Sequence, residues 1–422
     1  MRNLLVWCSI CGLLSGVELQ AMNWAYVAHN MDPGQVTVLQ TTNNTVFDTV
    51  PGLAGRSAKV ALTPDGSRVY VTLGATPGAV AVIRTSDNEV LTTITGLETM
   101  PWGVAVTPDG AKVYVTNWNM PGKVTVIRTS DNAILKTIAV ADNPIAVAVT
   151  PDGTRVYVTH WIWPAGQMTV IRTSDDMVLD TITGLSAYLG DIAITPDGTR
   201  AYVPYSSGGV LVLQIPDNSV LKNITGLDAQ QSGIAITPDG TKAYVVTANL
   251  FGGTLTVIRT SDNTVLKTIT LATRSAAVAI TPDGSKVYVT GYVTPGKIMV
   301  FQTSDDTLLT TIDVADMPRG IATLGGMQPP TNLTGSKTSA VFAAQIDWIN
   351  VLSWQAPVGG LAPAAYRIYR TYTNGVLSDL VGITMNTSFT DHNRIPGKPY
   401  TYYVVSVNSF GIQSLPVIVT VP

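Results

Sequence analysis

Few side chains in this sequence are suited to catalysis or metal binding. The chain of 422 residues has 3 His and 2 Cys, and its only glutamates are Glu18, Glu89 and Glu98. Both cysteines precede residue 21, which leaves the rest of the chain without a thiolate nucleophile or metal ligand. No Gly-x-Ser-x-Gly elbow and no glycine-rich phosphate loop occurs. We therefore expect no catalytic residue, no metal site and no cofactor.

Aromatic residues are the more distinctive candidates for a site. They are concentrated in one part of the chain, at Trp102, Trp118, Trp161, Trp163, Tyr188 and Tyr205. Exposed clusters of Trp and Tyr are typical of protein- and sugar-binding surfaces. The alternative is that long loops fold over each other and bury these rings.

A repeated motif indicates the elements that hold these residues. Thr-Pro-Asp-Gly recurs at intervals of 42–45 residues, beginning at Thr63, Thr107, Thr150, Thr195, Thr237 and Thr281. Each copy stands between short β-branched segments such as Val104–Val106 and Val113–Thr116, which are typical of strands. Pro, Asp and Gly suit a tight turn. This period is typical of four-stranded propeller blades.

The other strands of the repeat are present seven times. A Tyr-Val pair recurs at Tyr26, Tyr70, Tyr114, Tyr157, Tyr202, Tyr244 and Tyr288. The missing first strand is found at Gly320–Leu324, beyond the last copy. We expect an all-β fold in which residues 22–327 form a seven-bladed β-propeller, closed by three N-terminal strands and one C-terminal strand.

The sequence Val113-Tyr114-Val115-Thr116-Asn117, after Thr107-Pro108-Asp109-Gly110, resembles the YVTN family of β-propeller repeats over residues 22–326. That family occurs in surface-layer proteins of archaea and in secreted bacterial proteins. The resemblance implies a fold more than an activity, because propellers include binding modules, lactonases and quinoprotein subunits. The motif's Asn is kept only at Asn117, and elsewhere the same position varies, with His29 and His160 among its occupants. We expect this position to lie on a variable binding surface and its lone histidines to be exposed.

The end of the chain has a different pattern. After the linker Met327–Pro330, the segments Leu352–Pro357 and Tyr366–Arg370, followed by Tyr402, resemble a fibronectin type III domain. The resemblance implies a β-sandwich over residues 328–422, with Trp354 in the core and Tyr402 at a tyrosine corner. Such a domain would act as a spacer or docking module.

The first 21 residues and the overall charge bear on location and partners. Arg2 precedes an apolar run from Leu4 to Val17, which is the layout of a signal peptide over residues 1–21. We therefore expect a secreted, periplasmic or cell-surface protein with no membrane-spanning segment in the mature chain. The net charge of −3 provides no basic surface for nucleic acid.

Two repeated sets of charged residues have structural explanations. Asp in the repeated turns is expected to close those turns instead of binding calcium. Arg84, Arg128, Arg172 and Arg259 share one position of the repeat. We expect these arginines to pair between blades with a turn Asp or a backbone carbonyl.

These observations favour a non-catalytic protein that binds a protein or glycan through its aromatic loops. One alternative is a lactonase-like or redox propeller enzyme with its site at the mouth of the central channel, where Asp191 and Arg319 are expected. A metal site would need Asp142, Asp191 or Asp316 to converge. A second alternative is a structural protein that assembles into a surface layer.

Overall fold

The computed structural model describes residues 23–215, 217–248, 252–324, 331–342 and 345–422, apart from 357–362, 364, 372–376, 393, 396–397, 408–413 and 415–416. The expected signal peptide, the two cysteines and the linker therefore lie outside the described residues. The chain divides into two compact units. Asn23–Leu324 forms the first unit, and Gly325–Pro422 belongs to the second. In the part of the chain that the structure describes, no helix is long and apolar enough to cross a membrane.

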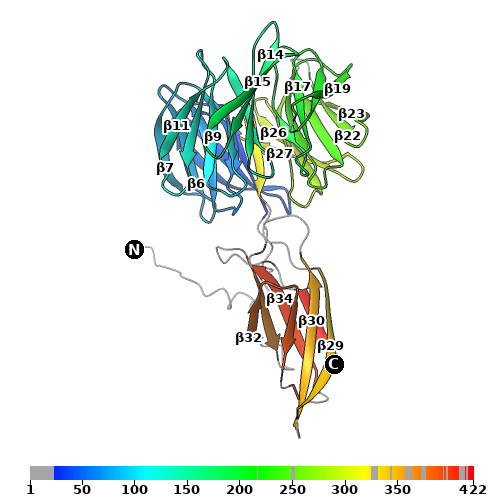
Figure 1. Ribbon diagram of the computed structural model, residues 1–422. Helices are drawn as coiled ribbons and strands as arrows, with labels where there is room; N and C mark the ends of the chain where they lie inside the picture. Colours follow the sequence, from blue (N-terminus) through cyan, green and yellow to red (C-terminus); the bar gives the residue numbers. More distant parts are fainter. Residues whose placement is uncertain are drawn as a thin grey trace. The chain divides into compact units, whose positions relative to one another are not determined.

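The described residues form nine sheets, of which seven have four strands and lie in the first unit (Figure 1). Sheet 1 joins the two ends of the unit in the order β28 (Pro318–Leu324), β1 (Trp24–His29), β2 (Gly34–Gln40), β3 (Thr45–Leu53). Sheet 2 contains β4 (Arg56–Leu62), β5 (Arg68–Gly74), β6 (Gly78–Arg84), β7 (Val90–Leu97). Sheet 3 contains β8 (Pro101–Val106), β9 (Lys112–Asn117), β10 (Lys123–Arg128), β11 (Ile134–Ala139).

Sheets 4 to 7 continue the same antiparallel order. Sheet 4 contains β12 (Pro144–Val149), β13 (Arg155–His160), β14 (Gly166–Arg172), β15 (Met177–Leu185). Sheet 5 contains β16 (Ala193–Ile194), β17 (Arg200–Tyr205), β18 (Gly209–Gln214), β19 (Val220–Thr225). Sheet 6 contains β20 (Gln231–Ile236), β21 (Lys242–Thr247), β22 (Gly253–Arg259), β23 (Thr264–Leu271). Sheet 7 contains β24 (Ser275–Ile280), β25 (Lys286–Gly291), β26 (Gly296–Gln302), β27 (Thr307–Val314).

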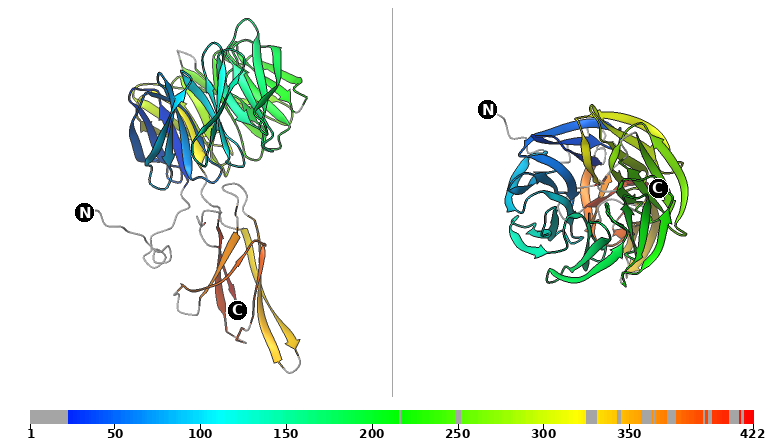
Figure 2. Two further views of the ribbon diagram at one scale, coloured as in Figure 1. Left: turned by 60° about the vertical axis from the view of Figure 1, so that its left-hand side comes forward. Right: turned by 90° about the horizontal axis from the view of Figure 1, so that it is seen from above.

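The sheets of the first unit surround a common centre, as the right-hand view of Figure 2 shows. Each innermost strand contacts the innermost strands of the two neighbouring sheets, and β28 contacts β4, so the ring is closed. β28 also pairs with β1, with Tyr26 opposite Ala322. The expected all-β fold is confirmed, and the arrangement is consistent with a β-propeller.

The repeated turn has a local physical cause. In sheet 3, Asp109 Oδ1 accepts hydrogen bonds from Thr107 Oγ1 at 2.5 Å and from the Ala111 amide at 2.9 Å. These bonds lower the pKa of Asp109, because they favour the charged carboxylate. Gly110 has a φ of 70°, a conformation that glycine adopts without steric cost. The Asp therefore closes the turn, as expected.

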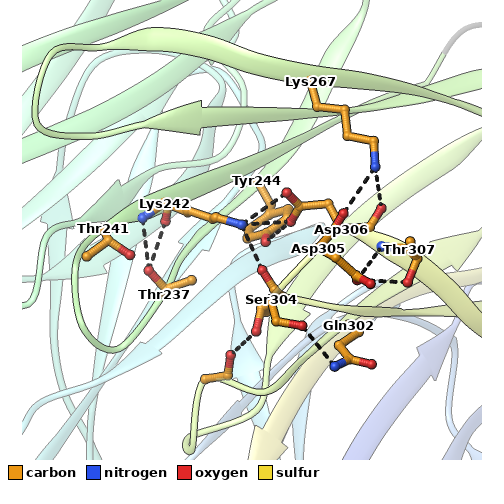
Figure 3. Close-up of polar contacts among 12 residues, drawn as sticks. Thr237, Thr241, Lys242, Tyr244, Lys267, Gln302, Ser304, Asp305, Asp306 and Thr307 are labelled. Atoms are coloured by element: carbon orange, nitrogen blue, oxygen red, sulfur yellow. Dashed lines mark hydrogen bonds and ion pairs between the residues drawn. The ribbon is translucent and has the colours of Figure 1, made fainter.

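Neighbouring sheets are joined by the tyrosines of the Tyr-Val pairs. Each hydroxyl donates to a turn residue of the next sheet that has a positive φ, in the pairs Tyr26–Asn88, Tyr70–Asn132, Tyr114–Asp176, Tyr157–Asn218, Tyr202–Asn263, Tyr244–Asp306 and Tyr288–Asn44. Figure 3 shows one junction, where Lys242 Nζ also lies 3.0 Å from Asp306 Oδ2. Burial and the bond to Asp306 raise the pKa of Tyr244. These polar contacts link adjacent sheets through fully buried tyrosines.

The second unit contains one three-stranded and one four-stranded sheet. The first has the order β29 (Thr331–Phe342), β30 (Gln345–Gln355), β33 (Ser388–Asp391). The second has the order β32 (Leu377–Thr384), β31 (Ala365–Thr371), β34 (Tyr400–Val407), β35 (Val417–Val421). Trp354 packs edge-on against Tyr366 in the core. Tyr402 is buried and donates to Asp391 Oδ2 at 2.7 Å.

Candidate functional site

The loops that carry most of the candidate residues lie at the end of the ring opposite the Thr-Pro-Asp-Gly turns, where the innermost strands begin. Here the connection between the second and third strand of a sheet meets the connection between sheets. One backbone hydrogen bond joins them repeatedly: the amides of Trp118, Trp161 and Tyr292 donate to the carbonyls of Met100, Asn143 and Arg274, at 2.7–2.9 Å. This bond fixes the backbone at the start of each connection. The side chains of different sheets therefore occupy equivalent places, although their residue types differ.

The structure brings the predicted aromatic residues together in two pairs. Trp102 and Trp118 lie edge-to-face with ring centroids 5.2 Å apart, and Trp161 lies 5.1 Å from Tyr188. All four side chains are half-buried. Trp163 is 69% exposed.

Tyr205 bridges to Leu189, next to Tyr188, but does not reach the surface. It is buried within sheet 5, and its hydroxyl donates to Asn223 Oδ1 at 2.9 Å.

An ion pair crosses the centre of the ring between sheets 2 and 5. Lys59 Nζ lies 2.7 Å from Asp191 Oδ2, and the side chains are 20% and 25% exposed. In a ring of seven sheets these two are separated by three steps, the largest separation that the ring allows. The other five sheets have small residues at the same position, four residues before the repeated turn or its equivalent: Gly103, Ala146, Gly233, Ala277 and Gly320. Lys59 and Asp191, here called the axial ion pair, are therefore the two charged side chains at this position of the seven sheets.

A second group, the arginine–aromatic cluster, adjoins the axial ion pair. The Arg319 guanidinium stacks on Trp102 at 4.2 Å from the ring centroid and lies 5.5 Å from the Tyr292 centroid. Arg274 is 5.3 Å from the same Tyr292 ring. Arg319 immediately precedes Gly320, whose added Cβ would lie 2.8 Å from Lys59 Cα. Desolvation lowers the pKa of Arg319, and the positive charge of Arg274 acts in the same direction.

The histidines are buried, and the expectation that they lie at the surface is wrong. Both His29 and His160 are inaccessible to solvent. His160 Nδ1 lies 3.0 Å from the Asp142 carbonyl and Nε2 lies 2.9 Å from Thr169 Oγ1. Since a carbonyl only accepts, Nδ1 carries the proton and Nε2 accepts from the threonine.

The variable position that contains these histidines is accordingly not a binding surface. At the same position, Asn117 Nδ2 donates to Thr125 Oγ1 at 2.9 Å. The side chain crosses to the neighbouring strand of its own sheet, so it varies in type while satisfying buried polar groups.

The repeated arginines also pair differently from the expectation. Arg84, Arg128, Arg172 and Arg259 each bind the Asp three residues later in the same hairpin turn, at 2.5–2.7 Å. These pairs are exposed and lie within one sheet instead of between blades. They have no role at the candidate site.

The proposed carboxylate site for a metal does not form. Among the described residues, no group of three or more His, Cys, Asp or Glu side chains could hold a metal ion. Asp142 Oδ1 accepts a bond from the Gly122 amide at 3.3 Å, while Asp191 pairs with Lys59. Asp142 and Asp191 therefore do not converge, as a metal site of the enzymatic alternative, lactonase-like or redox, would require.

Sequence reasoning missed Lys59, Arg274 and Tyr292. Alignment of the repeats contains the signal for Lys59, because Lys59 and Asp191 are the charged exceptions at a position otherwise occupied by Gly or Ala. Arg274 and Tyr292 have no such signal, since several residue types occur at each of their positions in the repeats.

The sequence matches no known family model and no curated protein. The YVTN and fibronectin type III resemblances therefore remain predictions.

Solved structures share the fold. A hydrazine synthase of Kuenenia stuttgartiensis has 19% identity and a TM-score of 0.57, covering 64% of this chain and 89% of its own. A protein of unknown function from Desulfotomaculum acetoxidans DSM 771 has 17% identity and a TM-score of 0.62, with 72% and 99% covered. The dihydro-heme d1 dehydrogenase NirN in complex with DHE has 16% identity and a TM-score of 0.53, with 72% and 76% covered.

The comparison supports the β-propeller fold and corrects the functional prediction. The hydrazine synthase and NirN are enzymes with β-propeller folds, which contradicts the interpretation of this chain as a non-catalytic binding protein. At these identities the likeness itself concerns the fold alone.

Proposed function

We propose that this protein is a redox propeller enzyme whose substrate binds at the centre of the ring, beside the axial ion pair. The observation that carries the proposal is the 2.7 Å contact between Lys59 and Asp191. Dehydrogenation of a substrate releases protons, and a carboxylate and an ammonium side by side are suited to accept and donate them. The two electrons would pass to two molecules of a soluble one-electron acceptor.

The proposal includes the finer architecture. The seven four-stranded sheets would be blades of the YVTN type, with β28 and β1–β3 as the closing blade. The second unit, with its three- and four-stranded sheets, would be a fibronectin type III-like sandwich over residues 328–422. Secretion to the periplasm or cell surface remains part of this proposal, and cell fractionation tests it.

A resident haem held by a histidine does not fit the described residues of the first unit. His29 and His160 each use both ring nitrogens, one on a loop carbonyl and the other on a threonine hydroxyl of the neighbouring strand. Cys8 and Cys11 are followed by Gly12, so the attachment sequence Cys-x-x-Cys-His is absent. The proposed chemistry therefore relies on the chain's own side chains and on an external acceptor.

The aromatic residues belong to the proposal as parts of the substrate surface. Trp102, Trp118, Trp161 and Tyr188 form two ring pairs at the same end of the first unit, and Trp163 is exposed. Tyr205 would support this surface from within sheet 5.

The test is a dye-linked assay. The purified protein is incubated with dihydro-heme d1, the substrate class named for NirN, and ferricyanide reduction is followed by absorbance. We expect turnover by the wild type and at least a tenfold lower rate in Asp191→Asn, with Arg84→Gln as a remote charge control. Equal rates in wild type and Asp191→Asn would exclude a role for the axial ion pair, and no turnover would count against this substrate.

A further inference from the structure

The arginine–aromatic cluster has several hydrogen-bond donors and lacks an acceptor. Within the described residues, neither Arg319 nor Arg274 forms an ion pair with a carboxylate, although 12 such pairs occur elsewhere in them. No carboxylate contributes to the pKa of Arg319, which is lowered by desolvation. An arginine held inside a protein is normally paired, because an unpaired buried charge is costly.

The Tyr292 hydroxyl adds a third donor. Its oxygen accepts a hydrogen bond from Asn30 Nδ2 at 3.0 Å. Because the oxygen is the acceptor in that bond, the hydroxyl proton remains available to donate. None of the described residues accepts it. Arg319, Arg274 and Tyr292 therefore bring several donors together, and none of the described carboxylates forms an ion pair with either arginine.

The geometry also specifies the shape of what would bind. The guanidinium carbon of Arg319 lies 4.2 Å from the centroid of the Trp102 ring, in cation–π contact, and the guanidinium carries N–H donors along the edge of its plane. Those edge donors match a carboxylate in a two-point contact. Trp102 itself packs against Trp118, which gives the walls of the cluster two aromatic rings.

We propose that this cluster is a binding subsite for the carboxylate of a planar aromatic or conjugated organic anion. Arg319 would hold the carboxylate by its edge donors, with Arg274 and the Tyr292 hydroxyl as further donors, while the ring of the ligand would lie against Trp102 and Trp118. The inference rests on the proposed function only where it calls the bound anion a substrate. The cluster would then select substrates that carry a carboxylate on a planar conjugated ring.

The experiment uses the full chain and an unreactive probe. Binding of 2-naphthoate is measured by calorimetry and by quenching of tryptophan fluorescence, beside the neutral isostere 2-naphthamide and inorganic phosphate. We expect 2-naphthoate to bind at least tenfold more tightly than either, and Arg319→Gln to lose at least tenfold in affinity. Arg319→Lys should also lose affinity, because an ammonium keeps the charge but not the planar fork.

Controls separate a binding defect from a folding defect. Arg84→Gln removes an equal charge from an exposed hairpin turn and should bind as the wild type does. Circular dichroism of each variant reports whether the ring is folded. Unchanged affinity in folded Arg319→Gln, or equal binding of phosphate or 2-naphthamide, would overturn the proposal. Since the probe needs no turnover, the subsite can fail this test while the redox activity stands, and the reverse also holds.

Discussion

Lys59 and Asp191 lie 132 positions apart in the sequence, yet their Nζ and Oδ2 atoms are 2.7 Å apart across the centre of the ring. The contact exists because β4 and the segment before β16 belong to sheets on opposite sides of a closed ring. It places one positive and one negative charge where the other five sheets present Gly or Ala. The centre of the ring is thereby charged at this level.

The first prediction concerns this ion pair. Each of Lys59→Met and Asp191→Asn leaves the partner charge partly buried without its counter-ion. We expect each variant to lose about 1–3 kcal/mol in the free energy of unfolding, between the values of exposed and fully buried pairs. Urea unfolding of both single variants and the double variant gives the coupling energy. Additive losses would show that the two side chains do not interact.

The second prediction concerns pH. Burial lowers the pKa of His160 to about 4, from an ordinary value of 6.5. The unfolded chain then binds the proton first as the pH falls, so His160 lowers stability progressively from about pH 6.5 to pH 4, by up to about 3 kcal/mol. Above pH 6.5 it has no such effect. Burial also lowers the pKa of His29, which adds to the loss.

A substitution taken from sheet 3 isolates the contribution of His160. In His160→Asn the new amide can donate to Thr169 as Asn117 donates to Thr125, and it does not titrate. Chemical denaturation at pH 7.5 and 4.5 should show a smaller acid loss than in the wild type. The same loss in both proteins would assign the acid sensitivity to other groups.

The third prediction concerns close packing at the centre. A Cβ at Gly103 would lie 2.7 Å from the Ile145 carbonyl oxygen and 3.0 Å from Ala146 Cα, which are backbone atoms of the next sheet. Gly103→Ala should therefore destabilise the ring by about 1–3 kcal/mol. Gly74→Ala is the matched control, since its Cβ would meet nothing nearer than 3.5 Å. Equal thermal unfolding temperatures of the two variants would contradict the packing argument.

The fourth prediction concerns closure of the ring. The Tyr288 hydroxyl donates to Asn44 Oδ1 at 2.5 Å, which joins sheet 7 to sheet 1. We expect Tyr288→Phe to cost about 1–2 kcal/mol, because a buried acceptor loses its donor. Tyr157→Phe removes the corresponding bond between sheets 4 and 5 and should cost a similar amount. Denaturant curves in which only Tyr157→Phe is destabilised would show that the junction at the chain ends contributes little.

Local patterns determined the strands, the turns and the four-stranded repeat. A Tyr-Val strand or a Thr-Pro-Asp-Gly turn depends on residues within about one repeat, and bonds such as Thr107 to Asp109 span two positions. Alternation and turn chemistry are visible at that range. The aromatic residues of the candidate site were also visible, since their side chains are distinctive wherever they occur.

Only the closed tertiary structure decided what lies at the centre. Lys59 and Asp191, like Arg319 and Trp102, come from different sheets, so neither contact has a local sequence pattern. The burial of His160 likewise has no local sequence pattern, because it depends on the contact between its ring and the loop carbonyl of Asp142. Repetition specifies each sheet separately, whereas the contacts at the centre depend on the few side chains that depart from the repeat and meet when the ring closes.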